Sequence, residues 1–148
     1  MNDLDALIDL LPQKPPFLFL DSVLEVEPFR SITGSKTFPS GHSIFENHLP
    51  GEPLVPGVIL VEALAQLAGL ALVGTEGRPI RGYLAEVTRM RFQRLVHPDE
   101  EIILHAELEQ AFGAFARFSA RASVGAETAA EGVITLARKG EGFSPGGP

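Results

Sequence analysis

One histidine and one glutamate are spaced so that they could act together on a substrate. His48 leads a loop that Pro50, Pro53 and Pro56 stiffen, and Glu62 follows fourteen residues later inside an almost wholly apolar stretch. A carboxyl group in an apolar helix is costly unless it is neutral, paired or useful. An imidazole held by a rigid loop is a proton carrier near neutral pH. The pair predicts acid–base chemistry on a substrate bound beside the start of a helix.

Composition and charge limit the classes of partner. The chain has 148 residues, the usual size of one domain, and its hydrophobic fraction of 45% is ordinary for a protein with a real core. The net charge of −7 argues against nucleic-acid binding by bulk electrostatics. The same charge repels an acidic partner, so such a partner requires a local basic patch.

Three features of the sequence bear on compartment and covalent chemistry. There is no cysteine, which excludes disulfides, thiolate nucleophiles and cysteine-type zinc sites. Residues 1–5 are acidic where a secretory signal needs positive charge. The longest apolar stretch, 58–73, is shorter than the roughly 20 residues of a membrane span, and it contains Glu62 and Gln66. We expect a cytoplasmic protein without a membrane partner.

The apolar stretch predicts a buried helix over 57–73, because it is too long and too rich in Ala and Leu for a strand. A helix that is apolar all round must be covered on nearly every side, and an antiparallel sheet curled around it is the economical solution. Uncovered sheet edges argue for a dimer. The other expected elements are a short helix over 3–11, strands over 17–27, 31–38, 81–96, 101–111, 114–124 and 129–138, a loop over 39–56, and a disordered tail over 139–148.

From residue 11 to about residue 138 the sequence resembles the hotdog-fold 3-hydroxyacyl-acyl-carrier-protein dehydratases of fatty acid synthesis, in the FabZ-like subgroup that carries Glu on the central helix. Residues 48–66 carry the resemblance without a gap. The segment Arg-Phe-Gln-Arg-Leu-Val-His-Pro-Asp at 91–99 and the opening at 11–21 also match. The resemblance implies one α+β domain over 1–138, an antiparallel sheet wrapped around a central helix.

The same resemblance implies how the protein acts. It implies a homodimer whose sheets join, with His48 of one subunit beside Glu62 of the other, and assemblies of three dimers are common in the family. The substrate is a 3-hydroxyacyl group on the phosphopantetheine of an acyl carrier protein, and no metal or organic cofactor takes part. The sister subgroup, which also isomerises the double bond, carries Asp at the position of Glu62, so Glu points to plain dehydration.

Three departures from the family pattern leave the catalytic groups in place. Gln13 and Lys14 replace a His-Arg pair, Asn47 stands where Gly is usual, and Glu52 replaces a basic residue. We expect these positions to alter the loop, the substrate tunnel or carrier docking. Chain length and pathway, fatty acid or another, therefore stay open.

Dehydration requires a base, an acid and a donor to the thioester carbonyl. Neutral His48 suits the base at C2, and Glu62, protonated through burial, suits the acid at the C3 hydroxyl. A scheme in which His48 moves both protons is the alternative. The N–H of Gly57 suits the donor, because a helix start has unpaired N–H groups and a positive dipole end. Gln66, one turn beyond Glu62, either orients the carboxyl group or makes a structural hydrogen bond.

The remaining polar residues are less specific. Arg89 and Arg91 share a strand face and form either a solvated surface or a patch for the acidic carrier and its phosphate. His42, His97 and His105 have spacings that favour neither catalysis nor metal binding. Two other functions are kept open: a non-catalytic hotdog subunit that binds acyl carriers, and an acyl-thioester hydrolase, which would not need the His48 loop.

Overall fold

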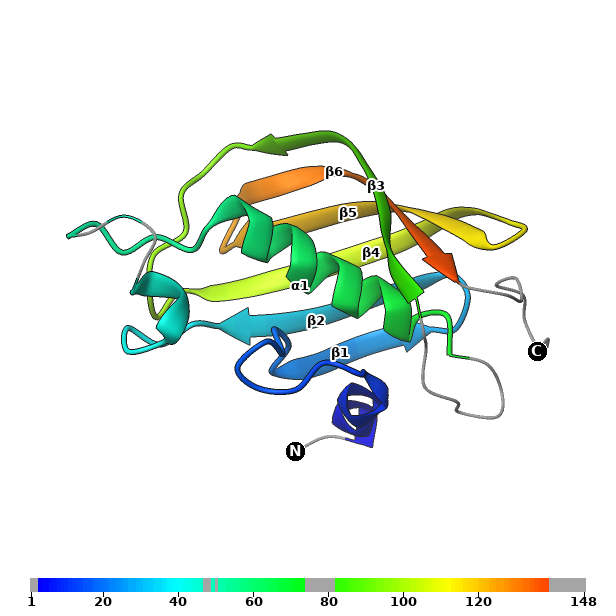
Figure 1. Cartoon of the computed structure of the whole chain (residues 1–148), viewed down its shortest axis with the longest axis horizontal. Helices are drawn as coiled ribbons and strands as arrows, with labels where there is room; N and C mark the ends of the chain where they lie inside the picture. Colours follow the sequence, from blue (N-terminus) through cyan, green and yellow to red (C-terminus); the bar gives the residue numbers. More distant parts are fainter. Residues whose placement is uncertain (1–2, 47–48, 50, 74–81, 139–148) are drawn as a thin grey trace.

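One α-helix lies across the concave side of a six-stranded antiparallel sheet (Figure 1). The computed structural model describes residues 3–46, 49, 51–73 and 82–138. The sheet order is β1-β2-β4-β5-β6-β3, so the strand that follows the helix closes the far edge. In chain order the elements are η1 (Asp3–Leu10), β1 (Ser22–Glu27), β2 (Ser31–Thr37), η2 (Ser43–Phe45), α1 (Gly57–Leu70), β3 (Gly82–Phe92), β4 (Glu101–Phe112), β5 (Phe115–Val124) and β6 (Glu127–Arg138), where η marks a 3₁₀ helix.

The sheet wrapped around one helix confirms the expected hotdog architecture, but the first strand begins later than the sequence predicts. Residues 17–20 lie outside the ladder, and two of them bond a side chain of the helix through their backbone. The amide of Phe19 donates to Gln66 Oε1 at 2.9 Å, and the carbonyl of Phe17 accepts from Gln66 Nε2 at 3.0 Å. The backbone of Phe17 and Phe19 therefore bonds the helix rather than a neighbouring strand.

The central helix is also shorter than predicted, ending at Leu70 rather than at residue 73. Beyond it, the amides of Leu72 and Val73 bond the carbonyls three residues back, in the tight turns common at helix ends. The carbonyl of Ala71 accepts instead from the amide of Phe29, at 2.7 Å. The N-terminal helix is 3₁₀ rather than α, and the predicted tail at 139–148 lies outside the described residues.

The core forms where the helix crosses the middle of the sheet. Leu64 and Leu67 are fully buried against strand residues such as Phe118 and Ile134, and each such side chain contributes about 1.5–3 kcal/mol by leaving water. A Cβ on Gly34 would meet Leu67 Cδ1 at 2.8 Å and the Ser22 carbonyl oxygen at 2.7 Å. Glycine at that position lets the helix approach β2 closely.

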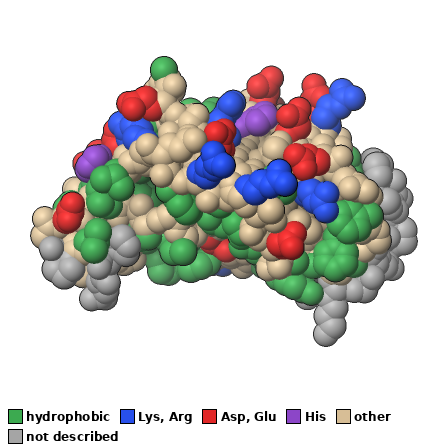
Figure 2. All heavy atoms as spheres, turned by 90° about the horizontal axis from the view of Figure 1, so that it is seen from above, with side chains coloured by type: hydrophobic (Ala, Val, Ile, Leu, Met, Phe, Trp, Pro, Cys, Tyr) green, Lys and Arg blue, Asp and Glu red, His purple; other side chains and the backbone are tan. Residues whose placement is uncertain are grey.

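The two sheet edges differ. On the β1 edge the amide of Val23 donates to Asp5 Oδ1 at 2.9 Å, so η1 is fixed against that edge. On the β3 edge, large apolar side chains stay exposed, among them Tyr83, Val87 and Phe92. Figure 2 views the molecule from this side, with charged side chains gathered above and hydrophobic ones below.

Candidate active site

The loop before α1 is anchored so that the helix start faces one fixed direction. The amide of Val55 donates to the carbonyl of Val96 at 2.8 Å, which ties the loop to the segment after β3. Pro56 is buried and occupies the N-cap with φ −59° and ψ 141°, and Gly57 is the first helical residue. The first turn of a helix presents N–H groups without intrahelical partners and a positive dipole end. Such an end can stabilise negative charge on a carbonyl oxygen.

The ring of Phe92 packs against Gly57. A Cβ on Gly57 would lie 2.8 Å from Phe92 Cε1 and 3.0 Å from Cζ, so no larger residue fits without moving the ring. In the structure this aromatic ring fills the space that the missing Cβ of Gly57 leaves. Phe92 is a neighbour of the helix start that sequence reasoning missed, although it lies in the segment that carries the family resemblance.

Glu62 and Gln66 form the polar centre of the site. Gln66 is 3% exposed, and its Nε2 donates to Glu62 Oε2 at 2.9 Å. The same amide bonds the backbone of Phe17 and Phe19, so Gln66 both orients the carboxyl group and fixes the N-terminal segment. The sequence left two roles open for Gln66, orienting the carboxyl group or making a structural hydrogen bond, and the structure contains contacts of both kinds. A contribution of Gln66 to catalysis stays a prediction. Glu62 is only partly buried in the single chain, less than its apolar surroundings suggested.

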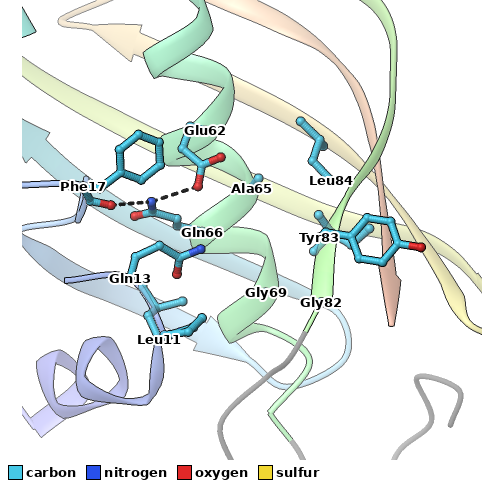
Figure 3. A pocket seen from close by; sticks show the side chains of 12 residues that line it. Leu11, Gln13, Phe17, Glu62, Ala65, Gln66, Gly69, Gly82, Tyr83 and Leu84 are labelled. Carbon is cyan, nitrogen blue, oxygen red and sulfur yellow. Dashed lines mark hydrogen bonds between the residues drawn. The ribbon is translucent and has the colours of Figure 1, made fainter. Parts of the chain in front are cut away.

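A cavity of about 240 Å³ opens beside Glu62 and follows the helix. Figure 3 shows Glu62, Gln66 and Gln13 in succession along one side of the cavity, with Tyr83 and Leu84 of β3 across from them. The complete lining comprises Leu11, Pro12, Gln13, Phe17, Glu62, Ala65, Gln66, Gly69, Gly82, Tyr83, Leu84 and Leu136. A carboxyl group at one end of a mostly apolar cavity suits proton transfer to a substrate with an apolar chain.

His48 lies outside the described residues, and no distance from it to Glu62 is given.

Each of the other three histidines contacts a partner in the described chain. His42 caps η2, its Nδ1 accepting from the amide of Ile44 at 3.1 Å, and burial together with the charge of Lys36 lowers its pKa. His97 contacts Glu100, and His105 Nδ1 lies 2.8 Å from Thr33 Oγ1. Within the described ranges no group of three metal-binding side chains occurs.

Arg89 and Arg91 lie on the other side of the sheet from α1, where they line an open hollow of about 440 Å³. A bulge between Thr88 and Arg91, with Arg89 at φ 54°, turns both arginines to this outer face. In the part of the chain that the structure describes, the side chain of neither arginine forms an ion pair or a hydrogen bond. Arg121, His105, Glu107 and Glu131 share the hollow.

Comparison with known proteins assigns this arrangement to a family. The profile of the FabA-like domain matches residues 11–133. The 3-hydroxyacyl-[acyl-carrier-protein] dehydratase FabZ of Polynucleobacter necessarius is 37% identical over 141 residues, covering 95% of each chain. The enzyme of the same name from Rickettsia bellii is 34% identical, covering 90% of this chain and 93% of its own.

This chain belongs to the FabA-like family. The fold of this FabA-like protein recurs in the dehydratase heterocomplex ApeI:P of Xenorhabdus doucetiae, with a TM-score of 0.74, 19% identity, and coverage of 90% and 91% of the two chains. It recurs also in Cj0977 of Campylobacter jejuni, with a TM-score of 0.71, 12% identity, and coverage of 94% and 92%. At these identities the two structures establish the hotdog fold and no more. No helix of the described FabA-like chain is long and apolar enough to span a membrane.

Proposed function

We propose that this protein is a hydro-lyase that removes water from 3-hydroxyacyl thioesters on an acyl carrier protein and forms trans-2-enoyl thioesters, in fatty acid synthesis or a related acyl pathway. The single observation that carries the proposal is Glu62, held by Gln66 at the polar end of the cavity. The identity of 37% with a FabZ dehydratase over nearly the whole chain supports the same reaction.

The chemistry divides between two side chains and the helix start. Neutral His48 removes the proton from C2, and the carboxyl group of Glu62 delivers a proton to the departing C3 hydroxyl, so that water leaves and the C2–C3 double bond forms. Each of these acid–base steps is worth roughly 10²–10⁴ in rate. The N–H of Gly57 stabilises the negative charge on the thioester oxygen and is worth roughly 10²–10³. Gln66 fixes the orientation of the Glu62 carboxyl group through its hydrogen bond.

The active form is a cytoplasmic homodimer that shares its sites, His48 of one subunit serving Glu62 of the other. The exposed apolar side chains along β3 support this, because an edge strand with unpaired backbone groups and apolar neighbours is suited to pairing with a second copy. Mixing inactive His48→Ala with inactive Glu62→Ala protein should restore activity, since a mixed dimer holds one intact site. Mixed dimers that mass spectrometry detects but that stay inactive would contradict the shared site.

Arg89 and Arg91 attract the acidic carrier. With a net charge of −7 the protein repels an anionic partner at long range, so a hollow in which three arginines outnumber two glutamates is where attraction is expected. The guanidinium groups also suit the phosphate of the phosphopantetheine arm.

A spectroscopic assay tests the proposed reaction. Formation of the conjugated enoyl thioester from a 3-hydroxyacyl thioester is the expected result. Release of free thiol without the conjugated product would instead indicate a hydrolase, and neither product would indicate a carrier-binding subunit without activity.

A further inference from the structure

His42 caps the short helix η2 with its ring rather than with a hydroxyl or a carboxylate. Its Nδ1 accepts from the amide of Ile44 at 3.1 Å, and its backbone has the extended conformation of an N-cap, with φ −67° and ψ 141°. Serine, threonine, aspartate and asparagine are the usual residues at such a position. A backbone N–H can only donate, so the ring must be neutral, with its hydrogen on Nε2. The start of η2 therefore depends on a group that titrates near neutral pH.

Buried neighbours hold the ring in this position. The ring of Phe38, which is 1% exposed, lies edge-on to the imidazole, with the centroids 5.3 Å apart and the planes at 85°. The ammonium of Lys36 lies 5.1 Å from the centroid of Phe38 and pairs with Asp21 at 3.0 Å. Burial and the charge of Lys36 lower the pKa of His42, and the charge of Asp21 acts in the opposite sense. The ring therefore stays neutral, and the cap stays intact, until the pH falls below the ordinary pKa of 6.5.

The capped helix begins the loop that contains the proposed base. Just before η2, the carbonyl of Phe38 accepts from the amide of Asp99 at 2.8 Å, which ties this end of the loop to the segment after β3. At the other end of η2, Glu46 is the C-cap. His48 lies outside the described residues, but it follows Glu46 by two positions, so the chain alone keeps the two α-carbons within about 7 Å of each other.

We propose that His42 is a positioning residue for His48: its neutral ring fixes the start of η2, and η2 fixes the direction in which the chain enters the catalytic loop. The inference rests on the proposed function in taking His48 as the base. A base acts only when it is held at the reacting carbon, so a loosened loop lowers kcat. Binding depends on the cavity beside Glu62, so KM changes little. Protonation adds a hydrogen to Nδ1, so the cap is lost as the pH falls through the folded-state pKa of His42.

The test compares His42→Leu and His42→Asn with the wild-type protein on a short 3-hydroxyacyl thioester of N-acetylcysteamine. Leucine is apolar, as a neighbour of Phe38 should be, but has no acceptor, whereas asparagine keeps an acceptor that does not titrate. We expect His42→Leu to lower kcat about fivefold at neutral pH, the effect of losing one N-cap. KM should stay within about twofold, and His42→Asn should restore kcat. His97→Leu, at an exposed histidine in the turn before β4, is the matched control.

The pH dependence gives a readout that a merely structural role would not change. The titration of His48 is common to both proteins, so it cancels in the ratio of kcat for His42→Asn to kcat for the wild type. This ratio should be near one at about pH 7.5 and should rise to about fivefold by about pH 4.5, because only the wild-type cap is lost. A constant ratio would overturn the proposal. Equal losses in His42→Leu and His42→Asn would overturn it too, as would wild-type kcat in His42→Leu, whatever its Tm.

Hydrogen exchange followed by mass spectrometry separates this inference from the proposed reaction. Peptides that cover 43–46 should exchange about fivefold faster in His42→Leu than in the wild-type protein or in His42→Asn. Peptides from β4 should exchange at the same rate in all three. If the wild-type protein forms no enoyl thioester, the proposed reaction fails, and the exchange rates still decide whether His42 fixes the loop. Unchanged exchange at 43–46 in His42→Leu would overturn the proposal.

Discussion

The two faces of the sheet differ in whether their polar side chains have hydrogen-bond partners. On the helix side, Gln66 uses both N–H groups and its carbonyl oxygen in bonds to Glu62, Phe17 and Phe19. On the outer side, the side chains of Arg89 and Arg91 form no ion pair or hydrogen bond within the described chain. A carboxyl group held by a buried amide is suited to chemistry, which requires a fixed position. Unpaired cations in an open hollow are suited to long-range attraction, which requires charge but no fixed geometry.

The largest expected effect comes from removing the proton of Glu62. Glu62→Gln keeps the shape of the side chain and its contact with Gln66, but it cannot donate a proton as a carboxylic acid does. We expect kcat on a short 3-hydroxyacyl thioester to fall by at least about 10², and His48→Ala to cause a loss of the same order. Circular dichroism and Tm should match the wild-type protein. Turnover at the wild-type rate in either variant would contradict the assignment of that residue as the acid or the base.

A smaller effect on rate, but a large one on stability, is expected from Gln66→Leu. The change leaves the buried amide of Phe19 without a partner, at a cost of about 1–3 kcal/mol, and it releases the partly buried carbonyl of Phe17, which water can bond instead. The free energy of unfolding in urea, at fixed protein concentration, should fall by about 1–3 kcal/mol. Gln110→Leu, on the exposed part of β4, should leave it within about 0.5 kcal/mol.

If Gln66→Leu keeps its stability, the hydrogen bonds to residues 17 and 19 contribute little, and the contrast between a fixed inner site and an open outer one fails. If stability falls while kcat per folded molecule is unchanged, Gln66 fixes the N-terminal segment without orienting Glu62.

The sequence predicted what depends on local spacing and missed what depends on long-range contacts. The central helix, its carboxyl group and the proximity of Glu62 and Gln66 follow from a turn of 3.6 residues. The start of the first strand does not, because the backbone of Phe17 and Phe19 bonds a side chain 47 to 49 positions away. Propensity within a short window contains no information about such a partner.

The positions of Phe92 and Gln13 around the site could not be predicted from the sequence either. Phe92 reads as an ordinary strand residue, and only the path of β3 past the helix start brings its ring to Gly57. Gln13 was visible as a departure from the family pattern, but its place in the lining of the cavity was not. The shared face of Arg89 and Arg91 was predicted from strict alternation, whereas the structure reaches it through a bulge.

The outer hollow gives the third prediction. Replacing both Arg89 and Arg91 with Ser should raise KM for a carrier-bound substrate at low salt and flatten its salt dependence, because the local attraction is removed. The loss on an acyl-cysteamine thioester, which has no protein charge, should be much smaller. Arg30→Ser, an exposed arginine near the β1–β2 turn, is the control. Equal losses on both substrates would mean that the pair supports the fold, and no loss on either would leave a solvated surface.

The smallest expected effect is on stability, and it distinguishes the structural Arg94 from Arg89 and Arg91. Arg94 lies three residues after Arg91, yet it forms a two-bond pair with Glu100, at 2.9 and 2.7 Å, and also contacts Glu127. The hydrogen bond from Arg94, together with that from the His97 amide, lowers the pKa of Glu100 from 4.5 to about 2. Because the folded-state pKa is the lower one, the unfolded chain binds the proton first as the pH falls. The contribution of Glu100 to stability is therefore complete above about pH 4.5 and is lost as the pH falls towards 2.

Glu100→Gln should accordingly lower Tm at neutral pH, and the gap from the wild-type protein should close as the pH falls through that window. Thermal unfolding followed at several pH values between 7 and 2.5 measures the gap, with Glu109→Gln on exposed β4 as the control. The effect should be modest, since both partners are partly exposed and water screens their attraction. A gap that stays constant from neutral pH to acid would mean that the charge of Glu100 does not matter. Arg94 would then hold Glu100 through hydrogen bonds whose contribution to stability does not depend on the charge of the carboxylate.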